Sequence, residues 1–209
     1  RPSVQSLPHA SLTFTLAGQL GRAGAMMTSP TGKCHTLDRA ADGYSRGEGC
    51  GTTMLRTSLG AAHALSVRVH ATSVRQDGRS ASLTAPSGPA QQLLIRAVLA
   101  EGGVGADAVV LTELHGTGTA LGDPIETGAL VEAFALRGGQ HSMLVGGIKA
   151  NIGHLESGAA IAGLVKLSGA LCGAAQMVCA PNAQLRQLNV YVADAVGGSS
   201  GLEAPSDAC

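Results

Sequence analysis

Two histidines in glycine-rich segments are the residues in this sequence best suited to do chemistry. His115 lies in segment 113–126 (ELHGTGTALGDPIE), and His154 lies in segment 146–160 (GGIKANIGHLESGAA). Imidazole can exchange protons near neutral pH, and its neutral form can donate a hydrogen bond to a developing oxyanion. Glycines allow the backbone to pass close to a ligand. The pattern therefore indicates proton transfer or anion stabilisation.

Each histidine segment follows a short apolar run that predicts a buried strand. The two runs are 108–114 and 142–146, and apolar helical patterns follow at 123–136 and 155–171. Strands and helices that alternate at this spacing predict an α/β layered fold with a largely parallel sheet. Ligands of such sheets bind where the strands end, so we expect both histidines at one edge of the sheet.

Other elements are expected along the rest of the chain. We expect strands at 52–55, 66–74 and 176–180 and helices at 10–25 and 90–101. Residues 1–8 are expected to be an irregular lead-in and residues 197–209 a disordered tail. Asp123 precedes a proline, so it is expected to cap the helix that starts there.

The glycines after His115 also permit a second interpretation, a phosphate cradle. Thr117 and Thr119 offer hydroxyls to a phosphate or an amide. However, the spacing GxGxxxG from residue 116 differs by one residue from the dinucleotide fingerprint and lacks the Lys-Ser/Thr ending of a P-loop. An ordinary turn with a loop histidine remains the simplest alternative.

His154 precedes a predicted helix and lies between two charged residues, Lys149 and Glu156. The positive end of a helix dipole favours the neutral imidazole, which suits donation to an oxyanion. Lys149 and Glu156 are close enough in sequence to pair and to order the loop. The alternative here is a solvated histidine beside a capped helix.

Composition excludes several classes of function. The 209 residues include 14 basic and 14 acidic ones, so no overall field attracts nucleic acid or an anionic membrane. The longest apolar helix candidate, 159–171, is shorter than the roughly 20 residues of a membrane span and contains Lys166. The five cysteines show no metal-binding spacing, so we expect no metal and a reducing, cytoplasmic compartment, with organelle import of a parent protein left open.

Further motifs accompany the histidine segments in a fixed order: 40–51 (AADGYSRGEGCG), 76–80 (QDGRS), 83–91 (LTAPSGPAQ) and 181–182 (PN). Together they make residues 34–192 resemble the later part of the ketosynthase domain of modular polyketide synthases, which is akin to fatty-acid β-ketoacyl synthases. The resemblance implies a thiolase-like fold, layered α/β/α/β/α in the complete domain. Residues 1–65 would end its N-terminal half, and residues 66–196 would form most of its C-terminal half.

The resemblance also implies a decarboxylative Claisen condensation of an acyl thioester with a malonyl-type extender. His115 and His154 would be the catalytic histidines, and Lys149 would order their hydrogen bonds with support from Glu126 or Glu156. No cofactor is expected to bind, because the substrates would arrive on the 4′-phosphopantetheine of an acyl carrier protein. Three polar residues would contact that arm: Thr117, Thr119 and Asn151.

The nucleophile of the family is missing from these 209 residues. It is the cysteine of an Asp-Thr-Ala-Cys-Ser-Ser type segment, whereas Cys50 matches a family position that is not nucleophilic. Cys34, Cys172 and Cys179 are expected to be buried and structural. The closing Gly-Phe-Gly-Gly-Thr-Asn-Ala-His segment is also absent. The chain is therefore expected to be a fragment, inactive alone, of a homodimeric parent that supplies the cysteine upstream of Arg1.

Two other functions fit parts of the sequence. A non-catalytic partner that dimerises with or supports a complete ketosynthase would account for the missing nucleophile. A thiolase on the same fold is disfavoured, because thiolases use a second cysteine where this motif has histidine.

Overall fold

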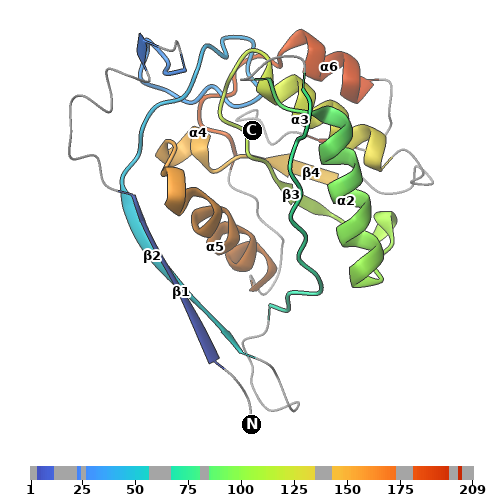
Figure 1. Cartoon of the computed structure of the whole chain (residues 1–209). Coiled ribbons are helices and arrows are strands. Elements are labelled where there is room, and N and C mark those ends of the chain that lie inside the picture. The colour runs from blue at the N-terminus through green and yellow to red at the C-terminus, as the bar shows by residue number, and fades with distance from the viewer. Residues whose placement is uncertain are drawn as a thin grey trace.

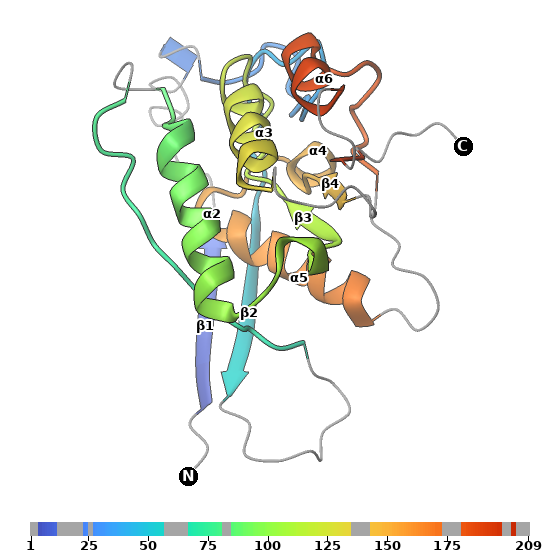
Figure 2. The ribbon, with the colours of Figure 1, turned by 90° about the vertical axis from the view of Figure 1, so that its right-hand side faces the viewer.

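The computed structural model describes residues 4–11, 23–24, 27–56, 67–80, 85–134, 143–172, 181–197 and 202–203. These parts form successive layers (Figure 1). A two-stranded ribbon of β1 (Val4–Ser11) and β2 (Gly49–Arg56) lies on one side of helix α5 (Ala159–Cys172), and a small parallel sheet lies on the other. Helices α2 (Gly88–Gly102), α3 (Gly122–Ala133) and α6 (Val190–Gly197) lie beyond that sheet. Figure 2 shows the same layers turned by 90°.

The sheet contains β3 (Leu111–Glu113), β4 (Met143–Gly146) and β5 (Leu202–Glu203) in that order, all parallel. Leu111 is opposite Leu144, and Met143 is opposite Leu202. The expected parallel sheet is thus confirmed among the described residues. The expectation of a disordered tail is wrong at residues 202–203, because their backbone pairs with β4.

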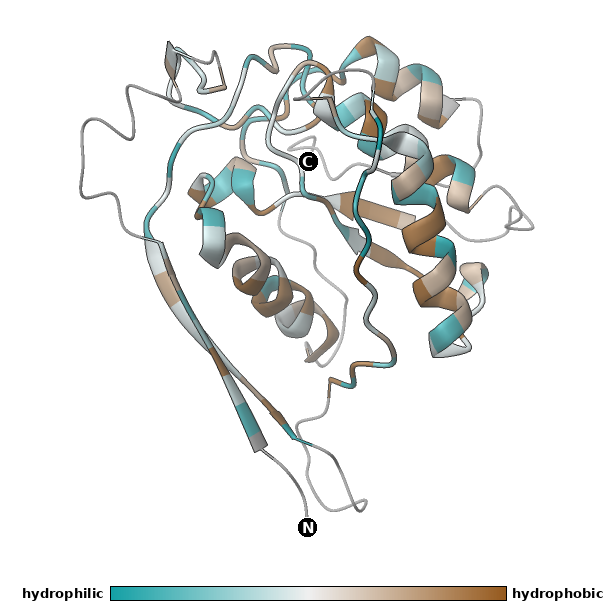
Figure 3. Ribbon diagram, in the orientation of Figure 1, coloured by the Kyte–Doolittle hydropathy of each residue, from teal (hydrophilic) through white to brown (hydrophobic). Residues whose placement is uncertain are grey.

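The hydrophobic core lies between this sheet and the helices on its outer face. Met143 and Val145 of β4 pack there with Leu130 of α3 and Val192 of α6, and all four side chains are buried. Figure 3 shows apolar colour on β3, β4 and stretches of α2. The core therefore fixes the sheet whose strand ends carry the histidine segments.

Helix α2 begins and ends where the sequence predicts. The Ser87 hydroxyl accepts a hydrogen bond from the Ala90 backbone N–H, and Pro89 occupies the first turn. Gly103 ends the helix with φ of 61°, a conformation that favours glycine. Local signals suffice for this helix because both of its caps lie within its own sequence.

The ribbon was not predicted correctly. Residues 4–8 are not an irregular lead-in, and Ala10 and Ser11 are not helical, because strand β1 pairs antiparallel with β2, with Pro8 opposite Thr52. The partner strand is some forty residues away, and strand formation depends more on such partners than on local propensity. The predicted strand at 52–55 is confirmed within β2.

Two further expectations concern strands. Residues 67–74 form no strand, and none of the described strands pairs with them. Val74 in this segment is 92% exposed. The strand expected at 176–180 lies outside the described residues. Within the described parts of the chain, no helix is long and apolar enough to cross a membrane.

Candidate active site

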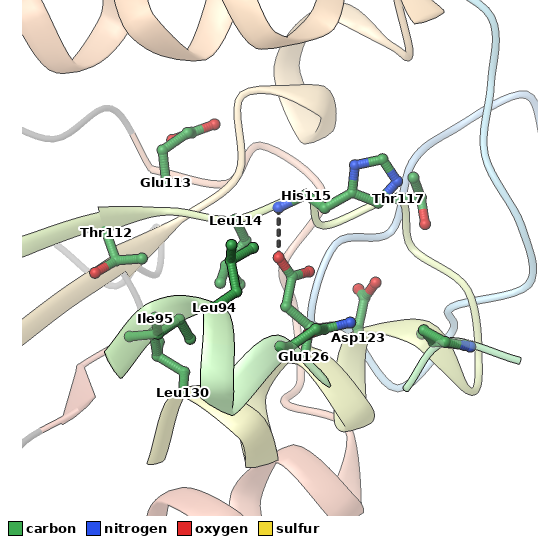
Figure 4. A pocket seen from close by; sticks show the side chains of 13 residues that line it. Leu94, Ile95, Thr112, Glu113, Leu114, His115, Thr117, Asp123, Glu126 and Leu130 are labelled. Carbon is green, nitrogen blue, oxygen red and sulfur yellow. Dashed lines mark hydrogen bonds between the residues drawn. The ribbon is translucent and has the colours of Figure 1, made fainter. Parts of the chain in front are cut away.

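The structure brings the two predicted histidines together. His115 follows β3, and His154 follows the short helix α4 (Lys149–Ile152), which itself follows β4. Their ring centroids are 5.6 Å apart, and the rings meet edge to face at 87°. Figure 4 shows His115 just beyond Leu114, at the end of the strand. Two strand ends of one parallel sheet thus deliver two imidazoles to one place, as the alternation of elements predicts.

His154 is held in a defined orientation. Its Nδ1 accepts a hydrogen bond from the Glu156 backbone N–H at 2.9 Å, and its own backbone N–H donates to the Ser45 carbonyl at 2.8 Å. The ring of Tyr44 packs against it with centroids 5.0 Å apart. Burial, reinforced by the positive charge of Lys149, lowers the pKa of His154 to about 4. At neutral pH the ring is therefore neutral, with its proton on Nε2, where it can donate.

Lys149 connects the two histidine segments. Its side chain is buried, and its Nζ donates a hydrogen bond to the His115 carbonyl at 2.5 Å. Burial lowers the pKa of this ammonium group, and the carboxylates of Glu126 and Glu113 oppose that effect. Burial of the His115 ring lowers its pKa, and the positive charge of Lys149 lowers that pKa further.

Glu156 does not pair with Lys149 as expected. Its carboxylate forms an ion pair with Arg46 at 2.5 Å. The reason is helix α4, which was expected to be a loop: Lys149 begins this turn and reaches back to the end of β3. Glu156 contributes to the site through its backbone N–H, which donates to His154, and through its ion pair with Arg46. Sequence spacing could not predict the pairing with Arg46.

Glu126 lies under the His115 loop. One carboxylate oxygen accepts from the His115 backbone N–H at 2.6 Å and the other from the Gly116 N–H at 2.9 Å. Burial raises the pKa of Glu126, and these two hydrogen bonds oppose the rise. Figure 4 shows the carboxylate pointing from α3 toward the backbone at His115. Glu126 therefore fixes the turn that carries the imidazole.

Asp123 performs a different task from the predicted helix cap. Its carboxylate accepts hydrogen bonds from the Leu37 N–H at 2.8 Å and the Gly118 N–H at 3.1 Å, and the side chain is 1% exposed. The hydroxyl of Thr119 instead accepts from the Gly122 N–H at the start of α3. A donor 86 residues away could not be identified from the Asp-Pro signal alone.

Thr36 packs beneath both histidine loops. Its hydroxyl donates to the Gly116 carbonyl at 2.7 Å, and the residue is fully buried. A Cβ atom on either Gly116 or Gly147 would lie 2.7 Å from Thr36 Cγ2. Both glycines are therefore needed for close approach to Thr36, whereas the sequence suggested close approach to a ligand.

The three residues expected to contact a phosphopantetheine arm are dispersed. Thr117 lines a pocket of about 320 Å³ between β3 and helices α2 and α3, together with His115 and Glu126 (Figure 4). The Thr119 hydroxyl is engaged at the start of α3, and the Asn151 amide donates to the Pro181 carbonyl at 3.0 Å. Of the three, only Thr117 lines this pocket.

The cysteines have different environments. Cys34 is buried, and its sulfur accepts a hydrogen bond from the Ser45 N–H, as expected of a structural residue. Cys172 is exposed, so its expected burial is wrong; it ends helix α5. Cys50 on β2 is also exposed. The described residues contain no cluster of three His, Cys, Asp or Glu side chains that could hold a metal ion.

Comparisons with known proteins agree with this geometry. Residues 67–184 match the family model "Beta-ketoacyl synthase, C-terminal domain", and residues 10–61 match its N-terminal counterpart. A phenolphthiocerol/phthiocerol polyketide synthase subunit of Mycobacterium tuberculosis is 42% identical over 143 residues, which are 67% of this chain and 6% of that protein. The 6-methylsalicylic acid synthase of Aspergillus niger is 39% identical over 181 residues, 83% of this chain and 10% of that protein.

Solved structures give the same result. The ketosynthase of module 6 of the bacillaene synthase from Bacillus subtilis has a TM-score of 0.80 at 29% identity, over 90% of this chain and 34% of that one. The oxazolomycin ketosynthase domain from Streptomyces albus has a TM-score of 0.85 at 28% identity, over 98% and 35%. The chain thus spans about a third of these ketosynthases and a tenth or less of those curated relatives.

The fold is accordingly the thiolase-like α/β fold of condensing enzymes. Within that class, the chain belongs to the β-ketoacyl synthase family and corresponds to part of a ketosynthase domain of polyketide synthases. The two family matches fall on either side of residues 62–66, and the boundary between halves at 65 and 66 stays a prediction.

Proposed function

We propose that this chain supplies the decarboxylating and oxyanion-stabilising half of a β-ketoacyl synthase site. The observation that carries the proposal is the pair of imidazoles 5.6 Å apart, with His154 fixed as an Nε2 donor and Lys149 bound to the carbonyl of His115. Donors that are already oriented toward developing negative charge stabilise a transition state without reorganisation.

The proposed chemistry begins with a malonyl-type thioester. Cleavage of its carboxylate bond releases CO₂, and the electron pair moves onto the thioester oxygen as an enolate. The ring N–H groups of His115 and His154 donate to that oxygen. The enolate carbon then attacks an acyl thioester held on a cysteine, and the cysteine leaves as a thiolate. That cysteine would come from outside these 209 residues.

The proposed substrates are thioesters on the 4′-phosphopantetheine of an acyl carrier protein. Support comes from the polyketide synthases that the chain matches, among them the mycobacterial phenolphthiocerol/phthiocerol synthase. Thr117 is the predicted arm-contacting residue best placed for this role, because it lines the same pocket as His115. A homodimeric parent in the cytoplasm remains part of the proposal.

The test uses a complete ketosynthase domain in which residues 10–184 replace the matching segment of the oxazolomycin ketosynthase. CO₂ release from malonyl carrier protein is measured for this protein and for its His115→Ala, His154→Ala and Glu132→Gln variants. We expect each histidine variant to lose about 100-fold or more in rate. Glu132 is exposed on α3, so its variant should retain full activity. Undiminished CO₂ release by both histidine variants would reject the proposal.

The second function considered, a non-catalytic partner of a complete ketosynthase, is not favoured. Burying Lys149 between the two imidazole loops costs folding free energy, and a purely structural partner would gain nothing from that cost.

A further inference from the structure

A buried ion pair joins the end of β3 to helix α5. Lys166 Nζ lies 2.8 Å from Glu113 Oε2, and the two side chains are only 8% and 7% exposed. Burying two charges costs free energy that their attraction does not reliably repay. The presence of this pair therefore suggests a role in positioning neighbouring groups, in addition to any effect on stability.

The second oxygen of Glu113 reaches the other histidine segment. Glu113 Oε1 accepts a hydrogen bond from the Ile148 backbone N–H at 2.5 Å. Ile148 directly precedes Lys149, and Glu113 lies two residues before His115. Figure 4 shows the Glu113 side chain on the face of β3 opposite Leu114. The carboxylate is thus placed to join the two loops.

Two cross-links therefore connect the same pair of loops in opposite directions. In one, a side chain from the His115 segment, Glu113, accepts from the backbone before Lys149. In the other, the Lys149 side chain donates to the backbone of His115. Removal of either link would leave only one of these two contacts to fix the loops relative to each other.

Helix α5 is shaped for this contact. A Cβ atom on Gly163 would lie 3.0 Å from Glu113 Cγ, a tight contact that would require the Glu113 side chain to shift slightly. Lys166 lies three residues along the same helix and reaches the carboxylate. Glycine and lysine at this spacing place a positive charge beside Glu113 within an apolar helix.

We propose that Glu113 and Lys166 are positioning residues that hold the segment 147–149 against the end of β3 and so set the placement of Lys149 relative to His115. Lys166 anchors the Glu113 carboxylate through the ion pair, and the carboxylate holds the Ile148 N–H through a hydrogen bond. The consequence for catalysis rests on the proposed function, whereas the consequence for the geometry of the site does not.

The first test follows the full 209-residue chain by NMR, using the Lys149 ammonium and the histidine ring resonances. Glu113→Gln and Lys166→Met should shift the His115 and Ile148 signals, and Glu113→Gln should lower the pKa of Lys149, because a carboxylate that raises it is gone. The matched controls are Glu101→Gln and Lys33→Met at exposed positions, which should leave these signals unchanged. Unchanged Lys149 and His115 signals in both buried variants would overturn the proposal.

The second test measures CO₂ release in the complete domain described above. Glu113→Gln and Lys166→Met should each lower kcat about 10-fold with little change in KM, and Lys166→Arg should restore most of the rate. The double variant should be no worse than either single one, because both remove the same link. Additive losses, or a full rate in the double variant, would contradict the positioning role.

The two tests distinguish failure of the proposed function from failure of the positioning role. If the unmodified complete domain releases no CO₂, the proposed function is rejected, while the NMR result still decides the geometry. If a single variant does not fold, the Glu113→Gln/Lys166→Met protein leaves no uncompensated charge and serves in its place. Wild-type signals and rate in that protein would overturn the proposal, and shifted signals with a reduced rate would support it.

Discussion

The Glu156 backbone N–H donates to Nδ1 of His154 over 2.9 Å. Because Nδ1 is an acceptor in this contact, a neutral His154 ring must carry its proton on Nε2. The position of one backbone group two residues further along the chain thus decides which nitrogen of the ring can act as a donor.

His154 should remain neutral down to mildly acidic pH. Its pKa is lowered to about 4, so between that value and about 6.5 the unfolded chain binds more protons than the folded one. The stability contributed by this group is therefore complete above about pH 6.5 and is lost as the pH falls toward 4. NMR titration of the ring checks the pKa, and urea unfolding of wild type and His154→Gln at several pH values checks the linkage. A ring midpoint above about pH 6 would contradict the prediction.

Lys149→Met should raise the pKa of both histidines. The ammonium charge of Lys149 contributes to the lowering of both values, so a neutral side chain of similar length removes that contribution. NMR titration of His115 and His154 in the variant is the measurement. Lys33→Met, at an exposed position, provides the control and should leave both midpoints in place. Unchanged midpoints in Lys149→Met would show that its charge does not act on the rings.

Glu126→Gln should destabilise the chain by about 1–3 kcal/mol. A glutamine can accept only one of the two hydrogen bonds from His115 and Gly116, and its amide nitrogen then faces a second N–H group. The free energy of unfolding in urea measures the loss. The control is Glu132→Gln, an exposed change on the same helix, for which we expect less than about 0.5 kcal/mol.

Gly118→Ala should cost much more than Gly103→Ala. Both glycines have positive φ, 76° and 61°, so alanine is strained at either position, by about 1 kcal/mol. At Gly103 the added Cβ meets open space, whereas at Gly118 it would lie 2.7 Å from the His35 backbone nitrogen. We expect a further loss of about 1–3 kcal/mol for Gly118→Ala. Equal losses in thermal or urea unfolding would contradict the close contact.

The 209-residue chain by itself should not form carbon–carbon bonds. Without the cysteine of the family segment there is no acyl-enzyme intermediate. Incubation with acyl and malonyl thioesters on carrier protein, followed by mass spectrometry of the products, checks this. Formation of a β-ketoacyl product that disappears in the His154→Ala variant would show that another group in the chain serves as nucleophile.

The parts of the fold that sequence predicts correctly have local signals. Helix α2 carries its own caps in Ser87 and Gly103, and strand β4 is a short apolar run followed by glycines. Strand β1 and segment 67–74 were predicted wrongly because a strand is defined by its partner: β1 has one in β2, and segment 67–74 has none among the described strands.

The same distinction applies to the site. The proximity of His115 and His154 follows from two loops at neighbouring strand ends, which periodicity can predict. The partners of Asp123 and Glu156 could not be predicted, because Leu37 and Arg46 lie 86 and 110 residues away in sequence. Residue spacing cannot predict long-range contacts of this kind, although they determine which backbone or side-chain groups each carboxylate binds.

Thr36 packs beneath both histidine loops although it belongs to the part of the chain that matches the N-terminal family domain. Recombination of this protein with a relative should therefore not place a crossover at residues 62–66. Such a crossover would combine one parent's residue 36 with the other parent's Gly116 and Gly147, and a bulkier side chain there would displace both loops together. With a crossover before residue 27, Thr36, Gly116 and Gly147 would all come from the same parent.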